Sequence, residues 1–245
     1  MTALERRSSV SLALIFALRM LGLFLVLPVF ALEARKYPGG DDPALVGLAM
    51  GIYGLTQGAL QMVFGAASDK LGRKKVLVFG LLIFAAGSFV AAAAESLMGL
   101  IVGRSLQGAG AVSAVVTALL ADQTRDVVRT KAMALIGASI GLMFALSLIL
   151  APALNAIAGL SGLFVLTGLL AFGGVAVVVW GVPPEPAMRT VADDWMTHFG
   201  APDLVIANAG VAGGFETADP ADLAVMRRML EINLLGVATT FQPFL

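Results

Sequence analysis

The sequence Gly65-Ala-Ala-Ser-Asp-Lys-Leu-Gly-Arg-Lys-Lys75 gathers one acid, four bases and two glycines between long runs without charge. Residues 43–68 lead into this stretch, residues 76–94 follow it, and neither run contains a charged residue. A run of about 20 apolar residues is long enough to cross a bilayer as a helix. Because lipid offers the backbone no hydrogen-bond partners, such runs have to be helical. The stretch is therefore predicted to be a short polar turn between two transmembrane helices.

The composition of the whole chain supports the same interpretation. Of its 245 residues, 59% are hydrophobic, 13% are charged and none is cysteine. Soluble domains average roughly 45–50% apolar and about 25% charged residues, so an ordinary soluble globule is excluded. The lack of cysteine excludes disulfides and thiolate metal sites. The net charge of zero averages two regions of opposite sign, since residues 1–185 carry 13 bases and 9 acids and residues 186–245 carry 3 and 7.

Three further runs extend the membrane domain. Residues 8–32 are interrupted only by Arg19, and residues 96–121 only by Arg104. The 53 residues 132–184 carry no charge and are too long for one span, so we expect a break around Gly159. An all-α domain of six transmembrane helices is thus predicted at residues 1–184, with helices at about 8–32, 43–68, 76–94, 96–121, 132–155 and 162–182.

The charges in the predicted turns are distributed unequally between the two sides of the membrane. One side would carry ten bases, at residues 6, 7, 70, 73, 74, 75, 125, 129, 131 and 189, and the other only Arg35 and Lys36. Turns rich in Lys and Arg stay in the cytoplasm. Both ends of the six-helix block are therefore predicted to be cytoplasmic, in a bacterial inner membrane.

Glycines recur along one face of the second and fifth predicted helices. At about 100° per residue, the glycines of the second helix fall on one narrow stripe. Such a stripe lets the backbone of a neighbouring helix come close. The alternative is that these glycines merely reflect the composition. The residues predicted to pack in this way are Gly47, Gly51, Gly54, Gly58, Gly137 and Gly141.

Two arginines fall inside predicted spans. Burying an arginine at the centre of a span costs at least about 2.5 kcal/mol, so Arg19 and Arg104 are predicted to line a central cavity. For Arg104 the alternative is a side chain that reaches the outer headgroups. Gln57, Gln61 and Gln107 are the neutral polar candidates beside them, although hydrogen bonds between helices would also explain these glutamines.

The opening stretch resembles motif A of the major facilitator superfamily, G-x-x-x-D-[RK]-x-G-R-[RK], at every position. Arg104-Ser-Leu-Gln107-Gly108-Ala-Gly110-Ala111 resembles its motif B, R-x-x-Q-G-x-G-A, in which Gly108 is a packing position. The resemblance covers about residues 4–183 and points to the drug:proton antiporter branch. It implies the six-helix N-terminal half of the major facilitator fold, which is a transporter fold and not an enzyme.

The resemblance also implies roles for particular residues. Motif A and an acid at the inner end of the fourth helix would form a conformational latch that stabilises the outward-facing state. Its residues are Gly65, Asp69, Lys70, Gly72, Arg73, Lys74 and Asp122. Arg104 would couple proton movement to the solute, beside Arg19, Gln57, Gln61 and Gln107 in the cavity.

A different pattern follows a junction at residues 185–190. Residues 203–210 are predicted to form a buried strand and residues 219–236 an amphipathic helix. Asn208-Ala209-Gly210 and Asn233 resemble motifs of the short-chain dehydrogenase/reductase family, so residues 191–245 are interpreted as an incomplete α/β, Rossmann-like fragment. Neither the dinucleotide-binding glycine turn nor a Tyr-x-x-x-Lys pair is present, so no cofactor and no dehydrogenase activity are expected.

The resemblance implies a partial proton-coupled secondary transporter that exports small amphipathic solutes. Its expected partners are the lipid bilayer, protons, the solute and a second half-transporter or second copy of the chain, but no nucleic acid and no metal. A six-helix half is expected to be incomplete on its own, because substrate sites of such transporters lie between two repeats. The alternatives are a membrane-anchored NAD(P)-dependent reductase fragment and a non-functional chimera.

Overall fold

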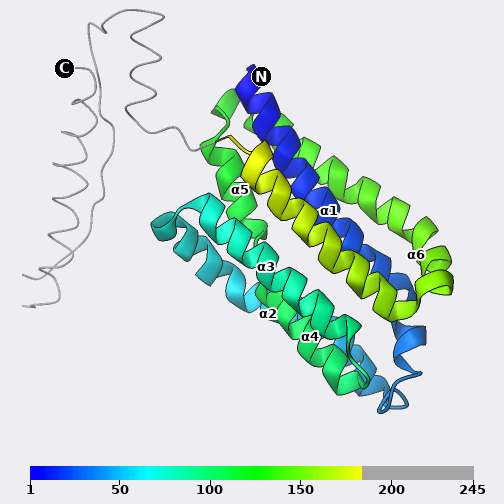
Figure 1. Ribbon diagram of the computed structural model, residues 1–245. Helices are drawn as coiled ribbons and strands as arrows, with labels where there is room; N and C mark the ends of the chain where they lie inside the picture. The colour runs from blue at the N-terminus through cyan, green and yellow to red at the C-terminus, as the bar shows by residue number, and fades with distance from the viewer. Residues whose placement is uncertain (184–245) are drawn as a thin grey trace, which may run out of the picture. The chain divides into compact units, whose positions relative to one another are not determined.

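The computed structural model describes residues 1–183, which form a bundle of helices without a β-strand in that range (Figure 1). The all-α prediction is confirmed for these residues. The junction at 185–190 and the predicted α/β fragment at 191–245 lie outside the described residues. The elements are α1 (Ala3–Ala34), α2 (Pro43–Leu71), α3 (Arg73–Ala92), α4 (Leu97–Ala109), α5 (Ser113–Asp122), α6 (Asp126–Ala176) and the π-helical turn η1 (Val177–Gly181).

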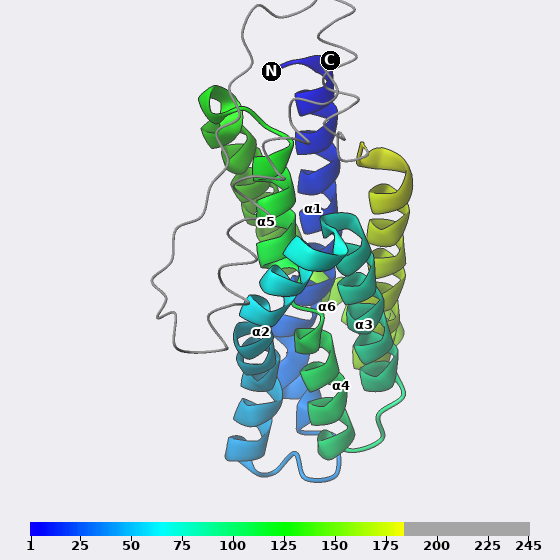
Figure 2. The same ribbon diagram turned by 90° about the vertical axis from the view of Figure 1, so that its left-hand side faces the viewer.

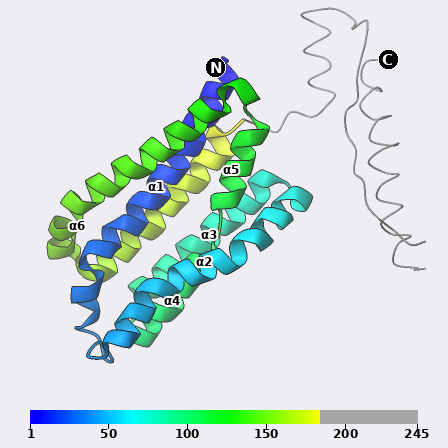
Figure 3. The same cartoon turned by 180° about the vertical axis from the view of Figure 1, so that it is seen from behind.

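The long element α6 folds back on itself at Gly159. This glycine has φ 65° and ψ −177°, a backbone conformation that side chains with a Cβ strongly disfavour. The two arms run in opposite directions, and α1 lies between them (Figures 1 and 3). By length and composition, residues 1–183 contain five helices able to cross a membrane, the last of which is the continuous stretch Asp126–Gly181. Because this stretch folds back, it supplies two membrane-length rods.

The predicted fourth helix is interrupted, whereas the sequence indicated one continuous helix at 96–121. The chain leaves α4 at Gly110 and enters α5 after Val112, whose N–H donates to Gly110 O over 2.9 Å. Gly110 lies so close to α3 that a side chain there would overlap Gly80 O and the side chain of Phe84. The break between α4 and α5 therefore lies where Gly110 packs closely on α3. Apolar periodicity alone does not predict this break.

The backbones of α3 and α4 pack closely, and this packing depends on glycines that the sequence analysis did not single out. A methyl group at Gly87 would overlap the backbone at Gln107, and one at Gly103 would overlap the backbone of Ala91. The predicted packing glycine Gly108 is also close to a neighbour, since a methyl group there would overlap Tyr53 O and Thr56 on α2. Figure 3 shows α2 running alongside α4.

The two predicted glycine stripes do not pack within the described residues. They are exposed, and no atom of a neighbouring element lies within 4 Å of where a methyl group would stand, at Gly47, Gly51, Gly54, Gly58, Gly137 and Gly141. The reason is geometric, because α2 and the first arm of α6 bury their opposite faces, at Ala49 and Tyr53 and at Ala132 and Ile136. The stripes leave two smooth faces on the surface of residues 1–183.

The close contact of α3 and α4 predicts opposite effects of two glycine substitutions. Gly103→Ala should destabilise the protein by about 1–3 kcal/mol, because the backbone of Ala91 has to move. Gly137→Ala, which meets no neighbour, should leave stability unchanged or raise it by up to about 1 kcal/mol through helix propensity. Thermal unfolding in detergent measures both variants. Equal effects of the two would show that the approach of α3 to α4 is not tight.

Candidate functional site

Arg19 lies in the interior of the bundle, with 1% of its surface exposed. Its guanidinium donates to Tyr53 Oη over 2.8 Å, to Gln57 Oε1 over 2.9 Å and to Ser113 Oγ over 3.1 Å. The ring of Phe84 lies beneath it, with 5.3 Å from Cζ to the ring centroid. The buried Nε has no partner in the described residues. Four helices thus enclose one positive charge without placing a carboxylate on it.

Arg104 is equally buried, and its partners are again neutral. It donates to the backbone oxygens of Ala49 and Met50 over 3.4 and 3.3 Å, and to Gln107 Oε1 over 3.3 Å. The amide nitrogen of Gln107 donates in turn to Ser88 Oγ over 2.8 Å. This arginine does not extend to the headgroup region, since 1% of its surface is exposed and it points into α2.

Tyr53 joins the two arginines, and sequence reasoning missed it. Its hydroxyl accepts from Arg19, while its ring lies 5.1 Å from the Arg104 guanidinium. A ring face carries negative electrostatic potential, so the stack stabilises the cation. Tyr53 is one of only two tyrosines in the chain and falls within a charge-free run, which was the available signal. The predicted Gln61 is half-buried on α2 and makes no hydrogen bond within residues 1–183.

The motif A residues meet at one end of the bundle. Arg73 forms ion pairs with Asp69 and with Asp122, the latter with 3.0 Å between Nε and Oδ2, and it donates to Ser68 Oγ over 2.7 Å. The Ser68 hydroxyl donates to Gly65 O over 2.7 Å. Gly72, with φ 93°, makes the turn from α2 into α3. Three helix ends, those of α2, α3 and α5, are therefore joined through one guanidinium.

The two remaining predicted residues of the latch lie beside this junction. Lys70 is exposed in the last turn of α2 and forms no ion pair within residues 1–183. Lys74 donates to the backbone oxygen of Val182, and so connects the start of α3 to the segment that follows η1. Asp69, Arg73 and Asp122 of the predicted set share one charge network.

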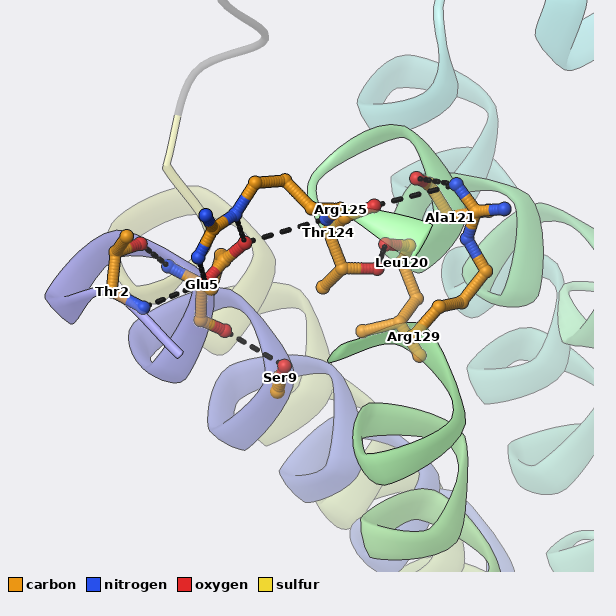
Figure 4. A network of polar contacts seen from close by, with 8 residues as sticks. All are labelled: Thr2, Glu5, Ser9, Leu120, Ala121, Thr124, Arg125 and Arg129. Atoms are coloured by element: carbon orange, nitrogen blue, oxygen red, sulfur yellow. Dashed lines mark hydrogen bonds and ion pairs between the residues drawn. The ribbon is translucent and has the colours of Figure 1, made fainter. Parts of the chain in front are cut away.

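A second ion pair at this end was missed by the sequence analysis (Figure 4). Glu5 accepts from Arg125 at two positions, with Nε–Oε1 2.7 Å and Nη2–Oε2 3.2 Å. Its carboxylate also accepts from Thr2 N, over 2.6 Å, and so caps α1. The hydrogen bonds that Arg125 donates to Glu5 raise the pKa of Arg125 above its ordinary value. The signal was a capping box, a threonine followed three residues later by a glutamate.

The described residues bear only in part on the predictions that no metal is bound and that residues 191–245 resemble a reductase. Residues 1–183 hold no group of three or more His, Cys, Asp or Glu side chains placed to bind a metal ion. Asn208, Ala209, Gly210 and Asn233 lie outside the described residues, so their likeness to a reductase stays a prediction.

The sequence profile of the Major Facilitator Superfamily matches residues 12–236. The chain belongs to the major facilitator superfamily. The chain is therefore an integral membrane protein of a transporter family and lies in a lipid bilayer.

Individual relatives agree with that assignment. Inner membrane transport protein YajR of Escherichia coli (strain K12) is 49% identical over 183 residues, which are 75% of this chain and 40% of YajR. Tetracycline resistance protein, class B, of Escherichia coli is 32% identical over 155 residues, 62% of this chain and 38% of that protein. The chain spans about two fifths of these relatives. YajR is a transport protein by name, which is consistent with the prediction of a transporter and not an enzyme.

A solved structure shows the same fold. The human organic anion transporter MFSD10 (TETRAN) superposes with a TM-score of 0.65 and 22% sequence identity, over 76% of this chain and 49% of that one. The match covers about half of the solved chain, so the helical arrangement of this chain is that of part of a major facilitator transporter.

Because Tyr53 contacts both Arg19 and Arg104, its substitution tests the arginine pair. Tyr53→Phe keeps the ring that stacks on Arg104 but removes an acceptor of Arg19, and should destabilise the protein by about 1–3 kcal/mol. Tyr37→Phe is the matched control, because the Tyr37 hydroxyl makes no hydrogen bond within residues 1–183, and should change little. Thermal unfolding in detergent provides the comparison. A Tyr53→Phe variant as stable as the wild type would mean that Gln57 and Ser113 alone satisfy the guanidinium of Arg19.

The motif A junction yields a further prediction. Asp122→Asn should speed amide hydrogen exchange at residues 70–76 about two- to fivefold, because a half-exposed ion pair is worth below about 1 kcal/mol. Asp126→Asn removes a carboxylate whose ion-pair partner within residues 1–183 is Arg129, and should leave exchange at residues 70–76 unchanged. If both variants behave alike, Asp122 does not hold the turn.

Proposed function

We propose that residues 1–183 form one half of a proton-coupled secondary transporter that exports small amphipathic solutes. The observation that carries this proposal is the pair of arginines, Arg19 and Arg104, each 1% exposed and each without a carboxylate partner in the described residues. An ionisable group held inside a membrane domain marks a pathway for solutes or ions. A purely structural bundle would gain from replacing these charges by apolar side chains.

The ion pairs of Arg73 support a latch in this transport cycle. Arg73 joins the ends of α2, α3 and α5, and these contacts are surface ion pairs of small individual strength. Contacts of that strength can break and reform as a transporter alternates between its two states. The role of Asp69 and Asp122 is therefore to bias the conformational equilibrium and not to hold the fold together.

The exposed glycine stripes support a partner bundle. Gly47, Gly51, Gly54 and Gly58 on α2, and Gly137 and Gly141 on α6, leave two faces where another helix backbone can approach closely. A second six-helix unit fits these faces, whether as another half-transporter or as a second copy of this chain. The substrate pathway would then run between the two units.

The charge distribution supports the orientation. Arg7, Arg73, Lys74 and Arg125 lie at the end of the bundle that carries the motif A turn and the start of α1 (Figures 1 and 2). Following the positive-inside rule, this end faces the cytoplasm of a bacterial inner membrane.

Reconstitution of the full chain tests the proposal. Proteoliposomes with trapped pyranine, which reports internal pH, would receive three amphipathic probes: ethidium as a cation, chloramphenicol as a neutral solute and taurocholate as an anion. At least one probe should drive proton movement, and nigericin, which collapses the pH gradient, should abolish accumulation of that probe. Arg104→Gln should reduce the coupled flux at least about tenfold if it removes a charge used in the cycle.

The control for charge removal is Arg35→Gln, which deletes an exposed arginine at the end of α1 and should transport as the wild type does. If none of the three probes elicits proton movement, or if nigericin leaves the flux of the probe unchanged, a proton-coupled transporter is refuted. Crosslinking in the same liposomes shows whether active preparations contain two copies of the chain.

A further inference from the structure

The break between α4 and α5 places the start of a helix next to Arg19. Arg19 donates to Ser113 Oγ over 3.1 Å, and Ser113 is the first residue of α5. Val112, at the N-cap position, has no side-chain oxygen, so no side chain caps the first N–H groups of this ten-residue helix. Free N–H groups at a helix start carry a partial positive charge and bind anions.

The guanidinium of Arg19 and the start of α5 are therefore two sources of positive potential that lie next to each other, with no carboxylate between them in the described residues. The partners of Arg19 are the neutral oxygens of Tyr53, Gln57 and Ser113, and its buried Nε has no partner in the described residues. The sequence carries no Asp or Glu at residues 6–32, 43–68, 70–94 or 96–121, so none of the spans around Arg19 can supply a counter-ion. A buried charge in this position calls for an external anion.

The acceptors of Arg19 are less buried than Arg19 itself. Arg19 is 1% exposed, whereas Gln57 and Ser113 are partly exposed. On either side of Gln57 along α2, Gly54 and Gly58 are exposed and present no side chain to an incoming molecule. A rotation of the Gln57 side chain, which releases one hydrogen bond of 2.9 Å, would open a route to the guanidinium.

We propose that Arg19, Ser113 and the start of α5 bind the carboxylate of an amphipathic organic anion, so that the solute of the proposed transporter is anionic. The inference deepens the proposed function and rests on it for the role of the bound anion as cargo. A planar carboxylate matches the parallel N–H groups of a guanidinium. A single arginine charge neutralises a monoanion, whereas a phosphate dianion would keep an uncompensated charge in the membrane.

Binding of benzoate, with benzamide as its neutral isostere, tests the site. The full chain in lipid nanodiscs would be unfolded thermally at pH 7 over a range of each compound, with ionic strength held constant by sodium chloride. Benzoate should raise the unfolding temperature in a saturable way and benzamide should not. A matching effect of phosphate without one of benzoate would assign the site to inorganic anions and overturn the proposal.

Variants connect the effect to the residues. Arg19→Gln should raise the half-saturating benzoate concentration about tenfold or more, since a charged donor is lost, and Ser113→Ala should raise it a few-fold. Arg19→Lys keeps the charge and should retain weakened binding, which covers the case in which Arg19→Gln fails to fold. Arg35→Gln, which removes an exposed arginine, should bind benzoate as the wild type does.

The outcomes separate this site from the transport activity. Benzoate binding that survives in Arg19→Gln or Arg19→Lys at full strength, equal effects of benzamide, or no binding of benzoate to the wild type would each overturn the anion site. If ethidium or chloramphenicol still drives proton flux in that case, the transporter stands with a different cargo. If benzoate binds through Arg19 and no probe drives flux, transport fails and the anion site stands.

Discussion

The bundle is built around the need to neutralise two guanidinium groups in hydrocarbon. A charge without partners at that depth costs several kcal/mol. Neutral oxygens and aromatic rings surround the guanidinium groups of both Arg19 and Arg104. Tyr53 serves both at once, and this fixes the rotation of α2 about its axis. With the polar face of α2 turned inward, its glycine face must point outward. The location of the exposed stripes is thus a consequence of the arginines.

The close contact of α3 with α4 meets the same need. Gly87 and Gly103 bring the two backbones together, and this sets Gln107 against Ser88 and Arg104 against α2. The packing of Gly110 on α3 coincides with the break that gives α5 its own start beside Arg19. Small residues and charged residues, which the sequence presents as separate patterns, therefore serve one arrangement.

Much of this arrangement could be predicted from the sequence, because charge-free runs and local motifs are one-dimensional signals. The helical fold, the position of Arg19 and Arg104 inside spans and the meeting of Asp69 with Arg73 belong to this class. The role of Tyr53, the break at Gly110 and the pairing of Glu5 with Arg125 depend on which elements become neighbours. A periodicity along one helix carries no information about which helix lies next to it. For that reason the glycine stripes of α2 and α6 predicted close packing but could not identify the helix that packs there.

The fold-back at Gly159 has a consequence for how the protein is made. Between Ala132 and Pro183 there is no charge, and the turn at Gly159 joins the two arms of α6 without a polar loop. No Lys or Arg at that turn can hold it on one side of a membrane during synthesis. We therefore expect the two arms to enter the bilayer together as a hairpin, with the direction of both set by the bases before them, Arg125, Arg129 and Lys131.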